Sequence, residues 1–140
     1  NGDVLAVTRN SARIAGKVKS GNVYIDGKSI GEIGSVVIRD RKLLSEDGLL
    51  SAIVTINEKT LEVINKPVII SRGFIYMREH TELTSELSNI VKDLVTNKLI
   101  AMKNVNVSIL KREITKLLND YIYEKTERSP MIMPVVMLVE

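Results

Sequence analysis

Residues 49–57, Leu-Leu-Ser-Ala-Ile-Val-Thr-Ile-Asn, decide the fold of this chain. Apolar and polar residues alternate along this stretch: Ala52, Val54 and Ile56 against Ser51, Thr55 and Asn57. A period of two is typical of a β-strand with one buried face. The turn sequence Glu58-Lys59-Thr60 follows, so the strand ends at Asn57. The stretch therefore predicts a sheet that needs a second layer to cover one face.

Three further stretches belong to this predicted sheet. Residues 61–64 indicate a short return strand, and residues 68–76 a β-branched and aromatic strand interrupted by Arg72-Gly73. A glycine inside such a strand indicates a bulge or a close backbone approach. Residues 131–139 are nearly all apolar, which is typical of a buried central strand. Pro134 opposes that assignment, because it removes a ladder donor and favours a bulge or one unpaired side.

Two amphipathic helices are predicted beside these strands. The first begins at Thr81, a good capping residue, and the second runs from about Val107 to Lys125. Apolar residues recur on one face of each: Leu83, Leu87, Ile90, Val91 and Leu94, then Leu110, Ile114, Leu117, Leu118 and Tyr121. We predict an α+β fold, a two-layer sandwich whose three main strands, 49–57, 68–76 and 131–139, are covered on one face by two helices.

The first 34 residues differ from this unit. Their strand candidates, 4–8, 13–18 and 23–25, are short and separated by glycines, so we interpret them as the edge of a larger sheet. A helix is predicted over residues 35–46, with the apolar residues Val36, Val37, Leu43 and Leu44, and it ends at Asp47-Gly48. We place a domain boundary there. The start at Asn1, without Met or an apolar leader, indicates the middle of a longer chain.

Composition excludes several classes of protein. The 140 residues are 44% apolar and 26% charged and include no Cys, which excludes disulfides, Cys-zinc sites and a Cys nucleophile. The single histidine, His80, excludes multi-histidine metal centres. The net charge of +3 is not concentrated in a basic tail, and no apolar run is long enough to span a membrane. We expect a soluble, cytoplasmic protein that is poorly equipped for catalysis.

Two residues are candidates for site chemistry. His80 precedes a predicted helix, and nothing near it in the sequence supplies the partner that a general base needs, so a surface or capping role is favoured. Asp26, in the turn pair Asp26-Gly27, offers a hard oxygen ligand for Ca²⁺ or Mn²⁺. One carboxylate is not a cation site, and the residues alone favour a plain turn aspartate.

Basic residues provide a second set of candidates. Arg39, Arg41 and Lys42 fall within about one helical turn, where they form either a solvated helix face or a phosphate contact. Arg72 could bind a carboxylate or a phosphate through two parallel hydrogen bonds, and a structural ion pair is the more common outcome. The chain has only five aromatic residues, so a platform for stacking RNA bases is thinly supplied. Lys125 and Arg128 flank the end of a helix, where cations complement the dipole.

Three stretches carry a family resemblance. They are residues 36–48, Val-Val-Ile-Arg-Asp-Arg-Lys-Leu-Leu-Ser-Glu-Asp-Gly; residues 71–76, Ser-Arg-Gly-Phe-Ile-Tyr; and Tyr-Glu-Lys-Thr at 123–126 followed by Pro-Met-Ile-Met-Pro-Val at 130–135. In order and spacing they resemble the C-terminal end of ribonuclease J, a bacterial RNA-decay enzyme. That family belongs to the metallo-β-lactamase superfamily and carries an inserted β-CASP domain.

The resemblance implies an organisation and an activity. Residues 1–34 are similar to the last β-rich segment of the catalytic domain, residues 35–47 to a connecting helix, and residues 48–140 to the small C-terminal domain. The whole enzyme hydrolyses RNA as a 5′→3′ exonuclease and as an endonuclease, in RNA decay and rRNA processing. Its zinc-type ions are held by His and Asp motifs upstream of Asn1, so we expect no catalytic residue and no catalytic cofactor in this chain.

The resemblance also carries over to one residue and to the partners. Asp26 lies in the Val-x-x-Asp-Gly turn that begins at Val23. It is similar to a ligand of the family's structural divalent-cation site, which implies a Ca²⁺ or Mn²⁺ ion. Without the other ligands we expect this partial site to be empty. We expect the chain to pack on the remainder of its own ribonuclease and to support self-association or pairing with a paralogue. The alternative is an RNA-binding module that guides single-stranded RNA through Arg39, Arg41, Lys42 and Arg72, although Glu127 and Ser129 dilute the family's terminal basic run.

Overall fold

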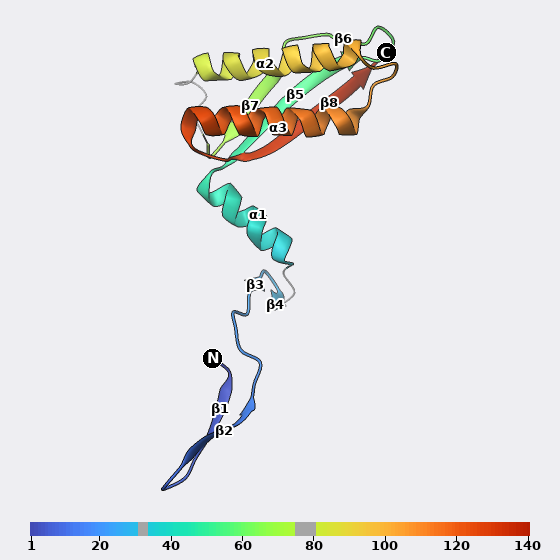
Figure 1. The fold of residues 1–140 in the computed structure, drawn as a ribbon. Coiled ribbons are helices and arrows are strands. Elements are labelled where there is room, and N and C mark those ends of the chain that lie inside the picture. Colours follow the sequence, from blue (N-terminus) through green and yellow to red (C-terminus); the bar gives the residue numbers. More distant parts are fainter. Residues whose placement is uncertain (31–33, 75–80) are drawn as a thin grey trace. The chain divides into compact units, whose positions relative to one another are not determined.

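The computed structural model describes residues 1–30, 34–74 and 81–140 (Figure 1). The chain divides into two compact units, residues 1–38 and residues 39–140.

The first unit consists of two β-hairpins. Strand β1 (Asp3–Val7) pairs with β2 (Ala12–Lys17), and β3 (Ile25–Asp26) pairs with β4 (Ser29–Ile30), each pair antiparallel. Every residue of this unit whose burial is described is exposed or only partly buried. Two of the three predicted strands, 4–8 and 13–18, are therefore present within a residue at each end, whereas of the predicted strand 23–25 only Ile25 lies in a strand, β3. These residues form no core of their own.

Helix α1 (Ser35–Glu46) has the predicted bounds, and the division between the units falls within it. Its predicted apolar stripe is not buried: Val36 is 56% exposed, and Val37 and Leu44 are also exposed. Leu43, the fourth residue of the stripe, is partly buried.

The second unit is built on a four-stranded sheet with β5 (Leu49–Asn57) at its centre. Strand β8 (Met131–Val139) runs parallel to β5 along its whole length. The opposite edge of β5 is shared, because β7 (Val68–Arg72) pairs antiparallel with its first half and β6 (Glu62–Val63) with its end. The predicted α+β fold is confirmed, with β6 as the predicted return strand.

Two predictions about the strands need correction. Residues 131–139 do not form the central strand, because β5 occupies that position and β8 lies at the edge of the sheet. The apolar residues of β8 point alternately toward the two faces of the sheet. Strand β7 ends at Arg72 rather than at residue 76. Gly73, with a φ of +71°, turns the chain out of the strand, and residues 75 and 76 lie outside the described ranges.

Helices α2 (Thr81–Ile100) and α3 (Val107–Thr126) lie side by side over one face of this sheet (Figure 1). Helix α3 begins after Asn106, whose side-chain oxygen accepts a hydrogen bond from the Ile109 backbone at 3.1 Å. It ends at Glu127, which adopts the left-handed conformation with a φ of 54°. Among the described helices, none is long and apolar enough to cross a membrane.

The core fills the space between the sheet and the helices. Alternate residues of β5 are fully buried there, as the period of two predicts: Leu50, Ala52, Val54 and Ile56. They meet the apolar stripes of α2 and α3, namely Leu87, Val91, Val95, Leu99, Leu110, Ile114, Leu118 and Ile122. Each large side chain buried in this way contributes about 1.5–3 kcal/mol, so this layer is what holds the second unit together.

Candidate interaction surface

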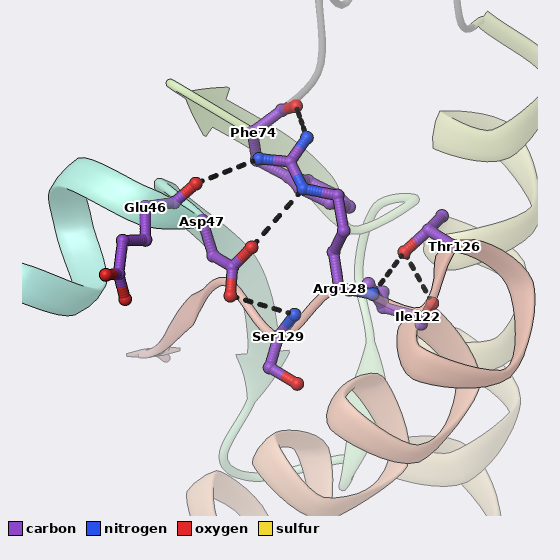
Figure 2. Close-up of polar contacts among 7 residues, drawn as sticks. All are labelled: Glu46, Asp47, Phe74, Ile122, Thr126, Arg128 and Ser129. Carbon is purple, nitrogen blue, oxygen red and sulfur yellow. Dashed lines mark hydrogen bonds and ion pairs between the residues drawn. The ribbon is translucent and has the colours of Figure 1, made fainter.

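A single arginine joins three segments of the second unit (Figure 2). The guanidinium of Arg128 donates to the carboxylate of Asp47 at 3.3 Å, to the Phe74 carbonyl at 2.9 Å and to the Glu46 carbonyl at 3.3 Å. These acceptors lie at the end of α1 and just beyond β7, whereas Arg128 itself leads into β8. The planar fork of an arginine suits such a three-way contact, because it presents several donors in fixed directions.

Further contacts hold Arg128 in place. The second oxygen of Asp47 accepts a hydrogen bond from the Ser129 backbone at 3.4 Å, and the hydroxyl of Thr126 accepts one from the Arg128 backbone at 3.3 Å. The guanidinium carbon also lies 5.2 Å from the centre of the Phe74 ring, within the range of a cation–π contact. We call Asp47, Phe74, Arg128 and Ser129 the arginine junction.

Glycine makes the close approach at this junction possible. Gly48 has a φ of +77°, and a Cβ added to it would lie 2.5 Å from the Phe74 nitrogen and against the carbonyl carbon of Gly73. The Gly48 carbonyl accepts the backbone hydrogen bond of Met131 at 2.9 Å. Of the two alternatives predicted at Gly73, a bulge or a close backbone approach, the structure shows the second, with Gly48 as the neighbouring backbone and Gly73 just beyond the end of β7.

The predicted RNA contacts lie on two elements. Arg39, Arg41 and Lys42 are exposed on α1, where Arg39 lies 3.2 Å from Asp40 and Lys42 lies 3.8 Å from Glu46. Arg72 is the last residue of β7 and donates to the carbonyl of the preceding Ser71 at 2.9 Å. Two of these cations thus pair with neighbouring carboxylates, and RNA binding by the four residues stays a prediction.

The predicted cation ligand does not belong to a cluster. Asp26 is exposed on β3, opposite Ser29 in the register of the hairpin. Across residues 1–30, 34–74 and 81–140, no three residues of the types His, Cys, Asp or Glu come together to hold a metal ion. Cation binding by Asp26 stays a prediction. His80 lies outside the described residues.

Two polar pairs connect α2 to α3. Lys98 lies 2.9 Å from Glu113, and its hydrogen bond and charge lower the pKa of that carboxyl. The hydroxyl of Tyr121 donates to Glu86 at 2.7 Å, and this hydrogen bond raises the pKa of the tyrosine. Both shifts have a pairing partner on the neighbouring helix, so they indicate structural contacts rather than a catalytic group.

The sheet face opposite the helices has a different character. In the observed register, one set of alternate residues from each strand shares this face: Leu49, Ser51, Ile53, Thr55, Asn57, Glu62, Val68, Ile70, Arg72, Met131, Met133, Val135, Met137 and Val139. We call this set the open sheet face. Val68 is 55% exposed, Met133 50% and Met137 46%. Exposed apolar side chains of this kind make the open sheet face a candidate interaction surface.

The outer edge of β8 is less suited to a partner than this face. The Met131 nitrogen donates to Gly48 and the Val139 carbonyl accepts from Glu58, each at 2.9 Å, so odd-numbered residues of β8 direct their backbone groups toward β5. Because these groups alternate along a strand, the nitrogen of Pro134 faces the outer edge. Pro134 thus leaves a missing donor there, which hinders the pairing of another strand. Of the two alternatives predicted for Pro134, a bulge or one unpaired side of the strand, the structure shows the unpaired side.

The fold and these surfaces describe a small α+β domain preceded by a helix and a β-rich segment. Comparison with known proteins identifies the class. The family described as the ribonuclease J C-terminal domain matches residues 36–139. The chain therefore belongs to the ribonuclease J family, as the three sequence stretches predicted.

Individual relatives agree with this assignment. The chain is 45% identical over 139 residues to ribonuclease J 1 of Streptococcus pyogenes, which covers 98% of this chain and 24% of that protein. It is 41% identical over 138 residues to ribonuclease J2 of Bacillus subtilis, covering 99% and 25%, and 38% identical over 135 residues to ribonuclease J 2 of Staphylococcus epidermidis, covering 96% and 24%. The chain thus spans about a quarter of the length of these relatives. Assignment of residues 1–34 to a catalytic domain stays a prediction.

Proposed function

We propose that this chain is the accessory C-terminal part of a bacterial ribonuclease J and that it supports assembly of the enzyme through the open sheet face. The whole enzyme then degrades and processes RNA in the cytoplasm, as both exonuclease and endonuclease. The observation that carries the proposal is the contrast between the two faces of one sheet. Two helices cover the first face. No described element covers the second, and Val68 and Met133 are therefore about half exposed on it.

Burial of the open sheet face would be favourable. Removal of apolar surface from water contributes about 25 cal/mol per Å², before the costs of association are subtracted. The polar residues at the centre of the face, Ser51 and Thr55, are uncharged, and the Ser51 hydroxyl already donates to the Met133 carbonyl at 2.8 Å. Covering such groups costs less than covering charges, because few hydrogen bonds to water are lost.

We assign hydrolysis to the remainder of the enzyme. The zinc-type ions and their bound water need several ligands held together, and the described part of this chain groups no such set. The chain then binds the catalytic domain of its own enzyme, and the catalytic domain binds RNA.

The RNA-guiding alternative has less support. Its cations Arg39 and Lys42 on α1 pair with the carboxylates of Asp40 and Glu46. The open sheet face has no aromatic side chain on which a base could stack. Both features weaken the attraction for a phosphate backbone or for unpaired bases.

Matched substitutions test the assembly role. Ile70→Glu places a charge on the open sheet face, whereas Ile100→Glu makes the same change at the end of α2, where the isoleucine is 80% exposed. We expect the mass measured by sedimentation velocity to rise with concentration for the unmodified chain and for Ile100→Glu. We expect Ile70→Glu to remain at 15.6 kDa. Association of Ile70→Glu equal to that of the unmodified chain would overturn the proposal, provided that circular dichroism shows both variants folded.

A further inference from the structure

The open sheet face contains most of the sulfur of this chain. The sequence has no cysteine and five methionines, and three of these, Met131, Met133 and Met137, lie on this face of β8. Met133 and Met137 are about half exposed, and Met131 is partly buried. Met102 packs against the core between the sheet and the helices, and Met77 lies outside the described residues. Within the described ranges, the thioethers most accessible to a small oxidant are therefore those of Met133 and Met137.

Strand formation does not explain why methionine occupies these positions. Half-exposed positions of a strand favour β-branched residues, and β8 has valine at two other positions of the same face, Val135 and Val139. Methionine instead supplies a flexible, polarisable side chain that adapts to an irregular partner surface. It also differs from valine in its chemistry, because a thioether is oxidised reversibly to a sulfoxide.

The surroundings of Met133 leave its side chain without a hydrogen-bond donor. Met133 lies beside Ser51 in the parallel register, and β8 is the edge strand of the sheet. The Ser51 hydroxyl has one hydrogen, which it donates to the Met133 carbonyl at 2.8 Å, so this hydrogen does not serve the side chain. Among the described elements, no strand lies on the other side of β8. A sulfoxide oxygen at this position therefore depends on water for its hydrogen bonds.

We propose that Met133 and Met137 are a reversible oxidation site that regulates the open sheet face: hydrogen peroxide converts their thioethers to sulfoxides, and the oxidised face no longer associates. This inference rests on the proposed assembly role and adds its regulation. In each oxidation, the sulfur lone pair attacks one peroxide oxygen, an S–O bond forms and the O–O bond breaks. The other oxygen leaves as water, so the sulfur is oxidised and the peroxide reduced by two electrons. A methionine sulfoxide reductase reverses the change with a dithiol, which becomes a disulfide as the oxygen leaves as water.

Oxidation changes the face in the direction that opposes burial. A sulfoxide oxygen is a polar acceptor, and an acceptor that loses its water on burial without gaining a donor destabilises the buried state. We expect oxidation of the two residues to weaken association at least about tenfold. Because coupling between two equilibria is reciprocal, association should in turn protect the same two thioethers from peroxide.

A peroxide titration tests the switch. The chain is treated with peroxide at a concentration where it is dissociated, the peroxide is removed, and sedimentation equilibrium then measures association. Peptide mass spectrometry of the same sample gives the oxidised fraction at each methionine. We expect Met133 and Met137 to be oxidised before Met102, and association to weaken at least about tenfold. Treatment with a methionine sulfoxide reductase and dithiothreitol should restore the original affinity.

Two variants of similar side-chain volume provide the matched comparison. The double variant Met133→Leu/Met137→Leu should associate like the unmodified chain and should keep that affinity after peroxide. Met102→Leu removes the thioether that packs against the core and should leave the sensitivity to peroxide unchanged. Met133→Gln places a polar side chain at the same position and should weaken association without any peroxide. Circular dichroism of each sample shows whether the chain is folded, and Met133→Gln tests the switch even if peroxide unfolds the chain.

The outcomes separate the switch from the assembly role. If the chain oxidised at Met133 and Met137 associates with unchanged affinity, or if the double leucine variant loses association to the same extent, the switch is wrong and the assembly role stands. If the untreated chain is a monomer at every concentration, the assembly role is wrong and the switch with it.

Discussion

The arginine junction predicts a large loss of stability from one substitution. Arg128→Met keeps an unbranched apolar stem but removes the guanidinium and its hydrogen bonds to three acceptors. The hydrogen bonds to the carbonyls of Phe74 and Glu46 are worth about 1 kcal/mol each. The partly exposed ion pair with Asp47 adds about 0.5–1 kcal/mol, and the cation–π contact a similar amount. Because these contacts share one group, we expect a total loss of about 2–3 kcal/mol.

Urea unfolding followed by far-ultraviolet circular dichroism measures this loss. With an m-value of about 1–3 kcal/mol per molar urea, the midpoint should fall by roughly 1 M or more. The control is Arg112→Met, because the Arg112 side chain is 75% exposed and its ion pair is with the adjacent Glu113 at 3.5 Å. That variant should stay within about 0.5 kcal/mol of the unmodified chain.

Arg128→Lys separates charge from geometry. A lysine keeps the positive charge near Asp47 but cannot reach three acceptors with fixed directions, so most of the loss should persist. The reasoning is refuted if Arg128→Met unfolds within about 0.5 kcal/mol of the unmodified chain. Full recovery by Arg128→Lys would show instead that charge alone accounts for the effect.

Three other predictions concern backbone, pH and RNA. Gly48→Ala should lower the free energy of unfolding in urea by at least about 2 kcal/mol, because Gly48 has a φ of +77° and the added Cβ would lie 2.5 Å from the Phe74 nitrogen. Gly16→Ala should leave that free energy nearly unchanged, because a Cβ added at Gly16 meets open space. The neighbours of Glu113 lower its pKa, so its ionised carboxylate stabilises the fold at pH values above the usual glutamate pKa of about 4.3. This stabilisation is lost as the pH falls through the lowered pKa. Glu113→Gln should therefore flatten the acid side of the plot of unfolding free energy against pH. Titration of labelled single-stranded RNA at two salt concentrations should show no salt-dependent binding; binding that Arg39→Ala weakens would favour the RNA-guiding role.

Local periodicity was sufficient to predict the two layers. The alternation along residues 49–57 and the stripes of the two long helices are short-range patterns, and each identifies the face that meets the core. The bounds of α1 and the turn at Gly48 follow from local residues in the same way. The α+β fold and the family could therefore be predicted from the sequence.

Pairing between distant segments could not be predicted in this way. The partners of Arg128 at the end of α1, Asp47 and Glu46, lie 81 and 82 residues away in the chain, so its local sequence suggested only a cation near a helix end. The nearly uniform apolar character of β8 predicted a central strand, but it arises because one set of its residues faces the helices and the other the open sheet face.

The central claim is that the open sheet face is covered when the chain associates, and methionine oxidation measures this most directly. Met133 and Met137 lie on that face, whereas Met102 follows α2 and is partly buried elsewhere. A fixed dose of peroxide, with peptide mass spectrometry, reports the oxidised fraction of each thioether. We predict that oxidation of Met133 and Met137 falls as the protein concentration rises, while that of Met102 stays constant. Unchanged oxidation of Met133 and Met137, in samples whose mass shows association, would contradict the account.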